Sequence, residues 1–304
     1  MGYLFLAIIC SSSIALIFKH SETSGRNRYA VTAANYLITV VLSIVLTGID
    51  GLRDLGDINV HDAIVEIGRT LADNNGPLSV SGSAGWAVMI GLGAGLFFFL
   101  GFVFYQQSVR EFGAGLSGAF AKLGILVPMT LSLLFWREMP TTIQWCGIVL
   151  AVASIVIVNF PTDGAWRKAL RPVLVLLFLS GGVAEFSNKL YQQYGLQDHK
   201  TIFLMVTFGV ALILSLGAMM RTGKRVTGKD VITGVAVGVP NLFSSYFLIQ
   251  ALEKIPATVA FPIFTAGSIL LINVVGWAVF KERLSGLEKI AVGVIVLALI
   301  LVNL

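Results

Sequence analysis

The sequence predicts an all-α polytopic membrane protein with ten transmembrane helices, arranged as two inverted five-helix repeats. Composition indicates the membrane, because 56% of the 304 residues are hydrophobic and only 12% are charged, whereas soluble proteins average roughly 25% charged residues. Apolar stretches of about 20 residues, the length that a spanning helix needs, alternate with short charged runs. A segment in the middle of the chain also returns near the C-terminus, which indicates a repeat.

Helices are favoured over membrane-spanning strands because the long apolar runs show no alternation. Strands of a membrane barrel alternate apolar and polar residues over roughly ten positions. The runs Trp86–Tyr105 and Ile143–Val158 are apolar on every face. We expect helices at residues 2–18, 29–48, 84–108, 114–136, 141–160, 170–192, 201–220, 230–251, 257–280 and 285–304.

The elements of the first half begin with a retained helix at residues 2–18. No basic segment opens it and no small-residue cleavage pattern precedes Lys19, so it does not resemble a signal peptide. After the helix at 29–48 comes a long extramembrane insertion, residues 49–83, described below. Pro128 lies inside the helix at 114–136 and is expected to kink it. Pro140 precedes the start of the helix at 141–160, where a missing amide hydrogen costs little.

The second half follows the same logic. Pro172 and Pro256 lie at or just before the starts of the helices at 170–192 and 257–280. Pro240 and Pro262 lie inside helices and are expected to bend them. Gly91, Gly95, Gly234 and Gly238 form two pairs with the four-residue spacing of close helix packing.

The insertion at residues 49–83 is acidic and contains the helix-like stretch VHDAIVEIGRTLADN. Two interpretations stay open for it. The first is an amphipathic helix that is solvated or lies on the membrane surface, and the second is a lid over an outer vestibule. Six acidic side chains support an extramembrane position: Asp50, Asp54, Asp57, Asp62, Glu66 and Asp73.

The positive charges give an orientation and argue against nucleic acid as a partner. Loops after the odd-numbered helices hold 14 Lys and Arg residues, and the opposite loops hold 5. By the positive-inside rule, both termini lie outside a cell membrane, either the bacterial inner membrane or the plasma membrane. The net charge of +5 suits anionic lipid headgroups, and there is no interleaving of basic and aromatic residues of the kind that single-stranded nucleic acid requires.

The repeat is visible in two matching segments. LFWREMPTTIQWCGIVL at Leu134–Leu150 corresponds to AVFKERLSGLEKIAVGV at Ala278–Val294, and two pairs of residues share one offset (282 − 138 = 144; 303 − 159 = 144). Five helices per half force the second half to insert upside down. The sequence therefore predicts repeats at residues 1–160 and 161–304. The paired residues are Glu138 with Glu282 and Asn159 with Asn303.

These segments resemble the drug/metabolite transporter superfamily, in particular its EamA-type ten-helix members. Trp-Arg-Glu (136–138), Gln144 and Gly147 carry the resemblance, and Phe-Lys-Glu-Arg (280–283) repeats it. The insertion at 49–83 departs from most members. The resemblance implies a secondary transporter, not an enzyme, that moves a small-molecule substrate by alternating access through a central cavity. Protons or a counter-substrate would drive it.

Three charged residues within the predicted spans are candidates for the site. Lys122 lies too deep to reach the interface easily and needs a partner or a water-filled cavity. Its alternative role is that of a structural counter-ion. Glu185 and Lys189 are four residues apart and can pair on one helix face. Glu185 is a candidate for a titrating acid that couples proton movement to transport, and the alternative is a structural ion pair.

Amides and aromatic residues within the spans complete the candidate substrate site. Each alone is explained by hydrogen bonding between helices, but together they suit a polar substrate. The candidates are Tyr105, Gln106, Asn188, Asn241, Tyr246 and Gln250.

The intramembrane charges favour an anionic substrate. Lys122 and Lys189 against Glu185 leave a charge of +1, which favours a carboxylate or phosphate, for example an amino acid. Choline-like cations bound by aromatic residues are the alternative substrate class. A membrane-embedded enzyme or a non-transporting membrane subunit would be a different class of protein. No cofactor or metal is predicted, because GAGLSG (113–118) follows no strand and the histidines and cysteines are scattered.

Overall fold

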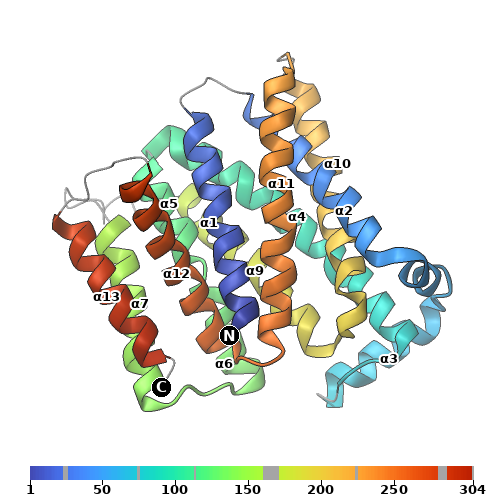
Figure 1. Cartoon of the computed structure of the whole chain (residues 1–304). Coiled ribbons are helices and arrows are strands. Elements are labelled where there is room, and N and C mark those ends of the chain that lie inside the picture. The colour runs from blue at the N-terminus through green and yellow to red at the C-terminus, as the bar shows by residue number, and fades with distance from the viewer. Residues whose placement is uncertain are drawn as a thin grey trace. The chain divides into compact units, whose positions relative to one another are not determined.

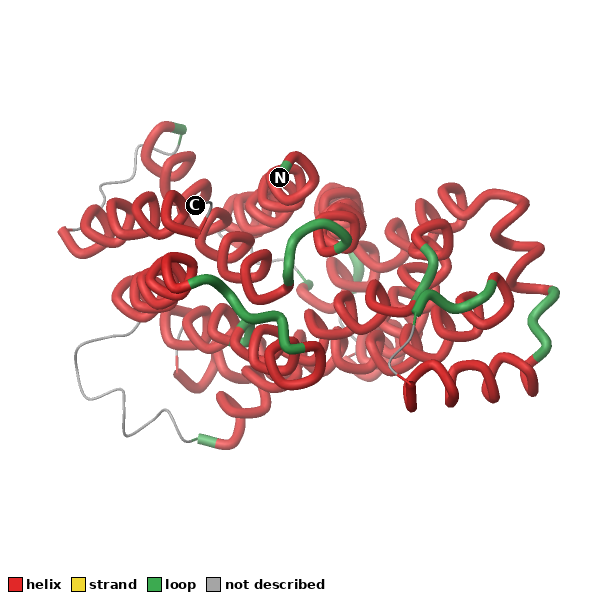
Figure 2. The backbone as a smooth tube through the Cα atoms, turned by 90° about the horizontal axis from the view of Figure 1, so that it is seen from below, coloured by secondary structure: helices red, strands yellow, loops and turns green. Residues whose placement is uncertain are grey.

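The computed structural model describes residues 1–22, 27–73, 76–112, 114–159, 171–222, 225–279 and 286–302. Every regular element in these ranges is a helix (Figures 1 and 2). The chain divides into two compact units. Unit 1 comprises Met1–Ser12, Leu100–Phe186 and Lys254–Leu304, and unit 2 comprises Ser13–Phe99 and Ser187–Glu253. The helices are α1 (Gly2–Glu22), α2 (Arg28–Gly56), α3 (Val60–Asp73), α4 (Val80–Phe112), α5 (Ala114–Leu123), α6 (Leu126–Trp136), α7 (Thr142–Asn159), α9 (Pro172–Tyr194), the short 3₁₀ helix η1 (Gln197–His199), α10 (Lys200–Thr222), α11 (Gly228–Leu252), α12 (Ala257–Ala278) and α13 (Gly286–Val302).

Six of the described helices are long and apolar enough to cross a membrane, and four shorter apolar helices accompany them. Each of the ten predicted ranges overlaps one of these ten segments, so the prediction of a multi-pass helical membrane protein is confirmed. The ten-helix inverted repeat stays a prediction, because four segments are short. Part of its signature, namely Phe-Lys-Glu-Arg (280–283) with Glu282, and Asn303, lies outside the described residues.

Two helical stretches contain an interruption, one at a predicted boundary and one inside a predicted helix. The predicted end of the second helix at Gly48 coincides with a break inside α2, where Gly48 has a φ of 65° and a ψ of −173°. A φ in this range is accessible to glycine at little cost. The predicted helix at 114–136 is interrupted, so that α5 ends at Leu123 and α6 begins at Leu126. By contrast, α11 and α12 continue through Pro240 and Pro262.

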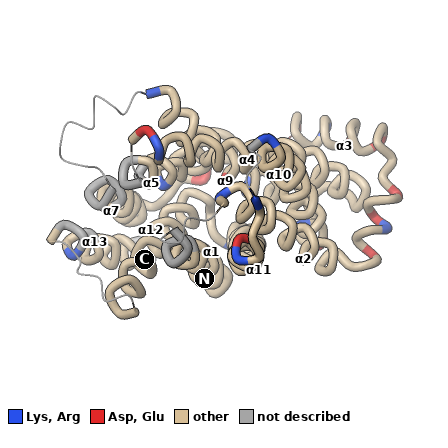
Figure 3. The backbone as a smooth tube through the Cα atoms, turned by 90° about the horizontal axis from the view of Figure 1, so that it is seen from above, with Lys and Arg blue, Asp and Glu red and all other residues tan. Residues whose placement is uncertain are grey.

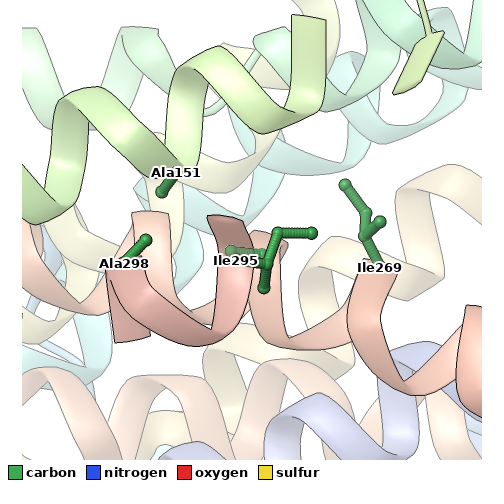
Figure 4. Close-up of a cluster of buried hydrophobic side chains, with 5 residues drawn as sticks. Ala151, Ile269, Ile295 and Ala298 are labelled. Atoms are coloured by element: carbon green, nitrogen blue, oxygen red, sulfur yellow. The ribbon is translucent and has the colours of Figure 1, made fainter. Parts of the chain in front are cut away.

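In unit 1, α13 packs along α7, and α12 contacts both. Small side chains permit the close approach, since Ala151 of α7 and Ala298 of α13 are buried against Ile295 and Ile269 (Figure 4).

Glu138 links the two sequence halves within unit 1. Its Oε2 accepts a hydrogen bond of 2.6 Å from the backbone N–H of Ala257, the first residue of α12. The first amide groups of a helix lack partners within the helix and lie at the positive end of its dipole. The carboxylate therefore caps α12, and in this structure Glu138 has a structural contact.

In unit 2, α2 packs against α11 and α10. A Cβ at Gly234 would lie 2.5 Å from the Val31 carbonyl oxygen, and one at Gly238 would lie 2.6 Å from that of Asn35. The backbones of α11 and α2 can approach this closely only because both residues are glycine. The predicted packing role of these two glycines is confirmed, and Gly91 and Gly95 of α4 make the same kind of contact with α10.

The helix-like stretch of the insertion forms α3, as predicted. Ala63 and Ile67 are buried, and Ala63 contacts Gly85 of α4. Glu66 Oε1 accepts a hydrogen bond of 2.6 Å from the backbone N–H of Ser79, the residue before α4. Acidic residues lie along α3 and the end of α2 (Figure 3). This packing agrees with the surface-lying amphipathic helix, and the lid stays untested.

Candidate functional site

The helix interruption between α5 and α6 follows from one proline. Pro128 has no N–H to donate to the carbonyl of Gly124, four residues earlier, and its ring crowds that carbonyl. The chain compensates with tighter turns, since the N–H of Ile125 bonds to Lys122 O (3.4 Å) and the N–H of Val127 bonds to Gly124 O (3.0 Å). Pro128 therefore interrupts the regular α-helical hydrogen bonding at Gly124 and Ile125, while Ile125 keeps right-handed helical dihedrals (φ −58°, ψ −23°).

Helix α9 packs directly on this break. A Cβ added to Gly182 would lie 2.6 Å from Gly124 O and 2.5 Å from Val127 Cγ2, and one added to Gly124 would lie 3.1 Å from Gly182 N. Two helix backbones approach this closely only where both residues lack a side chain. The break and α9 are thus in backbone contact within unit 1.

This contact brings together the two charged residues of unit 1 that the sequence identified. Lys122 lies in the last turn of α5, two residues before the break. Glu185 lies on α9, three residues after Gly182, and interacts electrostatically with Lys122. The end of α5 carries the partial negative charge of its unpaired carbonyl groups, which also favours an ammonium group there. Lys122, Glu185 and the break form what we call the α5–α9 site.

Two further candidates of unit 1 lie on α4. Gln106 is only 8% exposed, and its buried Nε2 donates no hydrogen bond to a described residue. Tyr105 is partly buried. Ser108 Oγ lies 2.6 Å from Ser117 Oγ and joins α4 to α5.

The other predicted site residues belong to unit 2. Asn241 donates from Nδ2 to Asn35 Oδ1 (3.2 Å) and so links α11 to α2, the packing role that was the alternative for each amide. Lys189 is buried, and its Nζ donates to Gln192 Oε1 (3.0 Å). Asn188 is fully buried beside it. The predicted pair of Glu185 with Lys189 stays a prediction.

Tyr246 and Gln250 lie one turn apart on α11, and both are partly exposed. The ammonium of Lys200 lies 4.7 Å from the centroid of the Tyr246 ring. Gln250 Oε1 is buried and has no hydrogen-bond partner among the described residues. The sequence identified both α11 residues but not Lys200, which was counted as an ordinary basic loop residue.

A second missed feature is a polar cluster of Asp54, Ser83 and His199, in which Ser83 and His199 are buried and Asp54 is partly exposed. His199 Nε2 lies 3.1 Å from Asp54 Oδ2, and its Nδ1 lies 3.0 Å from Ser83 Oγ. Since a carboxylate only accepts, Nε2 carries the hydrogen of the first bond. Ser83 Oγ also accepts from the N–H of Leu196 (2.8 Å). The cluster ties the insertion to α4 and η1.

This cluster contains a serine, a histidine and an aspartate but does not have the arrangement of a hydrolase. Ser83 is fully buried, so its hydroxyl is closed to a substrate. A nucleophilic serine must instead reach the substrate while a base holds its proton.

Comparison with known proteins identifies the C-terminal part of the chain. Residues 173–304 match the EamA-like transporter family. This part of the chain is similar to EamA-like transporter domains. An uncharacterized protein of Haemophilus influenzae is 24% identical over 297 residues, which cover 96% of this chain and 94% of that protein.

A solved crystal structure shares the fold, with a TM-score of 0.69 and 17% sequence identity over 98% of this chain and 94% of that one. The EamA-like domain confirms the predicted resemblance to the drug/metabolite transporter superfamily. It agrees with the apolar helices in indicating a multi-pass membrane transporter of small molecules.

Proposed function

We propose that this EamA-like protein is a secondary active transporter of a small polar metabolite that bears a carboxylate or phosphate, for example an amino acid. Transport proceeds by alternating access between two inverted repeats, residues 1–160 and 161–304. Two residue pairs that share an offset of 144 positions, Glu138 with Glu282 and Asn159 with Asn303, support this repeat. The protein lies in the cell membrane with both termini outside, and a proton or a counter-substrate drives it.

The observation that carries the proposal is Lys122 at the interruption between α5 and α6. Secondary transporters typically bind substrates where a membrane helix is discontinuous, because the helix ends there present unpaired backbone groups. A charge within a span is costly unless it has a partner or a function. Here a cation lies in the last turn before such a break, with one carboxylate from α9 in electrostatic range.

In the proposed mechanism, the ammonium group of Lys122 exchanges one anionic partner, Glu185, for another, the substrate. In the empty protein, Glu185 balances the charge of Lys122. A substrate carboxylate or phosphate competes for the same ammonium group, and it binds best when Glu185 takes up a proton. Glu185 thereby couples proton movement to substrate movement, and the buried amide group of Gln106 on α4 donates a further hydrogen bond to the substrate.

Two alternatives are less well supported. A choline-like cation would need an open aromatic face, and Lys200 already lies against the ring of Tyr246. A hydrolytic enzyme would need an accessible nucleophile, and Ser83 of the polar cluster is inaccessible. The anionic substrate therefore stays the leading proposal.

The test is a thermal-shift screen of the purified protein against metabolites, since a ligand that binds the folded state raises the unfolding temperature. We expect a carboxylate- or phosphate-bearing compound to stabilise the wild type more than the Lys122→Ala variant. Lys254→Ala, at an exposed lysine, is the matched control and retains the shift. Equal stabilisation of the wild type and Lys122→Ala would overturn the role of Lys122.

The coupling role of Glu185 is tested separately with the ligand from the screen. Glu185→Gln is expected to remove the pH dependence of uptake and to leave exchange of substrate for substrate. A variant with the wild-type pH profile would show that another group carries the proton.

A further inference from the structure

Two of the buried charged residues of unit 2, Asp230 and Lys200, have different sets of hydrogen-bond partners. Asp230 is 2% exposed, and three described donors satisfy its carboxylate: the backbone N–H (2.9 Å) and hydroxyl (2.7 Å) of Thr227, and the N–H of Asn27 (3.2 Å). Such full satisfaction is expected of a buried charge with a structural role. Lys200 is 8% exposed and lacks an equivalent set of partners.

The contacts of Lys200 leave its charge uncompensated. Its Nζ donates one hydrogen bond of 2.9 Å, to the carbonyl oxygen of Gln197, and lies against the Tyr246 ring. In the described part of the chain no carboxylate forms an ion pair with it. An ammonium group has three hydrogens to donate, so two remain for another acceptor. Lys200 is the first residue of α10. The positive end of the α10 helix dipole therefore lies near its ammonium group and also favours an anion there.

The neighbouring amides also lack partners. The Oε1 atoms of Gln197 and Gln250 are buried and accept no hydrogen bond from a described residue. Gln250 lies one turn beyond Tyr246, in the last turns of α11. Tyr246 and Gln250 are both partly exposed, whereas Lys200 is only 8% exposed.

We infer that Lys200, Tyr246 and Gln250 form a second recognition site, for a small carboxylate that carries an adjacent N–H donor, as an α-amino acid does. The carboxylate binds Lys200, and the amide oxygen of Gln250 accepts from the ligand's amino group. The Tyr246 ring fixes the direction of the ammonium group. The inference rests on the proposed transport function, since a site where α10 begins and α11 ends would receive substrate at one membrane face.

The test uses three probes with nearly the same carbon skeleton, titrated against purified protein at constant ionic strength and followed by thermal shift. L-alanine has both the carboxylate and the amino group, propionate has only the carboxylate, and L-alaninamide has only the amino group. We expect L-alanine to bind best and propionate more weakly, and L-alaninamide not to bind. Lys200→Gln should weaken the binding of L-alanine by about tenfold or more, because a hydrogen bond between charged groups is lost.

Four variants separate this site from others. Lys200→Arg should retain part of the affinity, and Tyr246→Leu should weaken it, while Lys254→Gln should leave it unchanged. Lys122→Gln should also leave this binding in place if the two sites are separate. Binding that survives Lys200→Gln but is lost with Lys122→Gln would overturn the inference and leave the proposed function standing. An absence of binding of L-alanine and propionate to the wild type would also overturn it, without any measurement of transport.

Discussion

The backbone contact between Gly182 and Gly124 gives the sharpest test of the α5–α9 site, because Gly181 beside it provides a matched control. A Cβ at Gly182 would lie 2.6 Å from Gly124 O, whereas contacts of real Cβ atoms are essentially never under 3.0 Å and rarely under 3.4 Å. Gly182→Ala would therefore push α9 away from the break by about 0.4–0.8 Å (3.0 − 2.6 and 3.4 − 2.6). A Cβ at Gly181 has nothing within 4 Å.

Two opposing contributions to the free energy of unfolding decide the effect of each substitution. Replacing a glycine inside a helix with alanine gains roughly 0.5–1 kcal/mol, and overpacking costs typically about 1–3 kcal/mol. Gly181→Ala should thus be neutral or slightly stabilising, and Gly182→Ala should be destabilising by about 1–2 kcal/mol. The assay is the apparent unfolding temperature in detergent at a fixed scan rate, followed by tryptophan fluorescence. Equal unfolding temperatures for the two variants would refute the packing of α9 on the break.

Three further predictions concern single contacts. Glu138→Gln weakens the cap on α12 and should lower stability by about 0.5–1 kcal/mol, measured as a drop in unfolding temperature; an unchanged temperature would show that the contact contributes nothing. A double-mutant cycle of Lys122→Gln and Glu185→Gln should give a coupling energy of about 0.5–3 kcal/mol in thermal unfolding, and strict additivity would contradict their pairing. His199→Ala removes the two hydrogen bonds that its ring makes, to Asp54 and Ser83, and should speed proteolysis within residues 49–83, whereas wild-type cleavage rates would count against the anchoring role.

Most of the fold was predictable, because long apolar runs and proline positions are local signals. The helical insertion and the packing glycines of α11 also followed from spacing alone. The interruption of the helix at Gly124 could not be predicted in this way, because a proline inside a helix can either bend the helix or interrupt it. Pro128 interrupts its helix, whereas α12 continues through Pro262.

The candidate site was predictable residue by residue but not as a set of contacts. Lys122 and Glu185 stood out because charges are costly within a membrane, yet the sequence suggested Lys189 as the partner of Glu185 by helical spacing. The approach of α9 to the break depends on two glycines far apart in the chain, and one sequence does not reveal such a contact. The sequence did not indicate Lys200 and His199 because polar residues in a predicted loop are expected to be solvated. In the structure both side chains are buried.

The most direct test of the central claim is counterflow in proteoliposomes, with the stabilising metabolite from the thermal-shift screen as substrate. The proposal predicts that wild-type protein accumulates labelled substrate against unlabelled substrate inside, and that Lys122→Ala abolishes this accumulation while its unfolding profile shows a folded protein. Accumulation by Lys122→Ala at the wild-type rate would contradict the role of the α5–α9 site in transport.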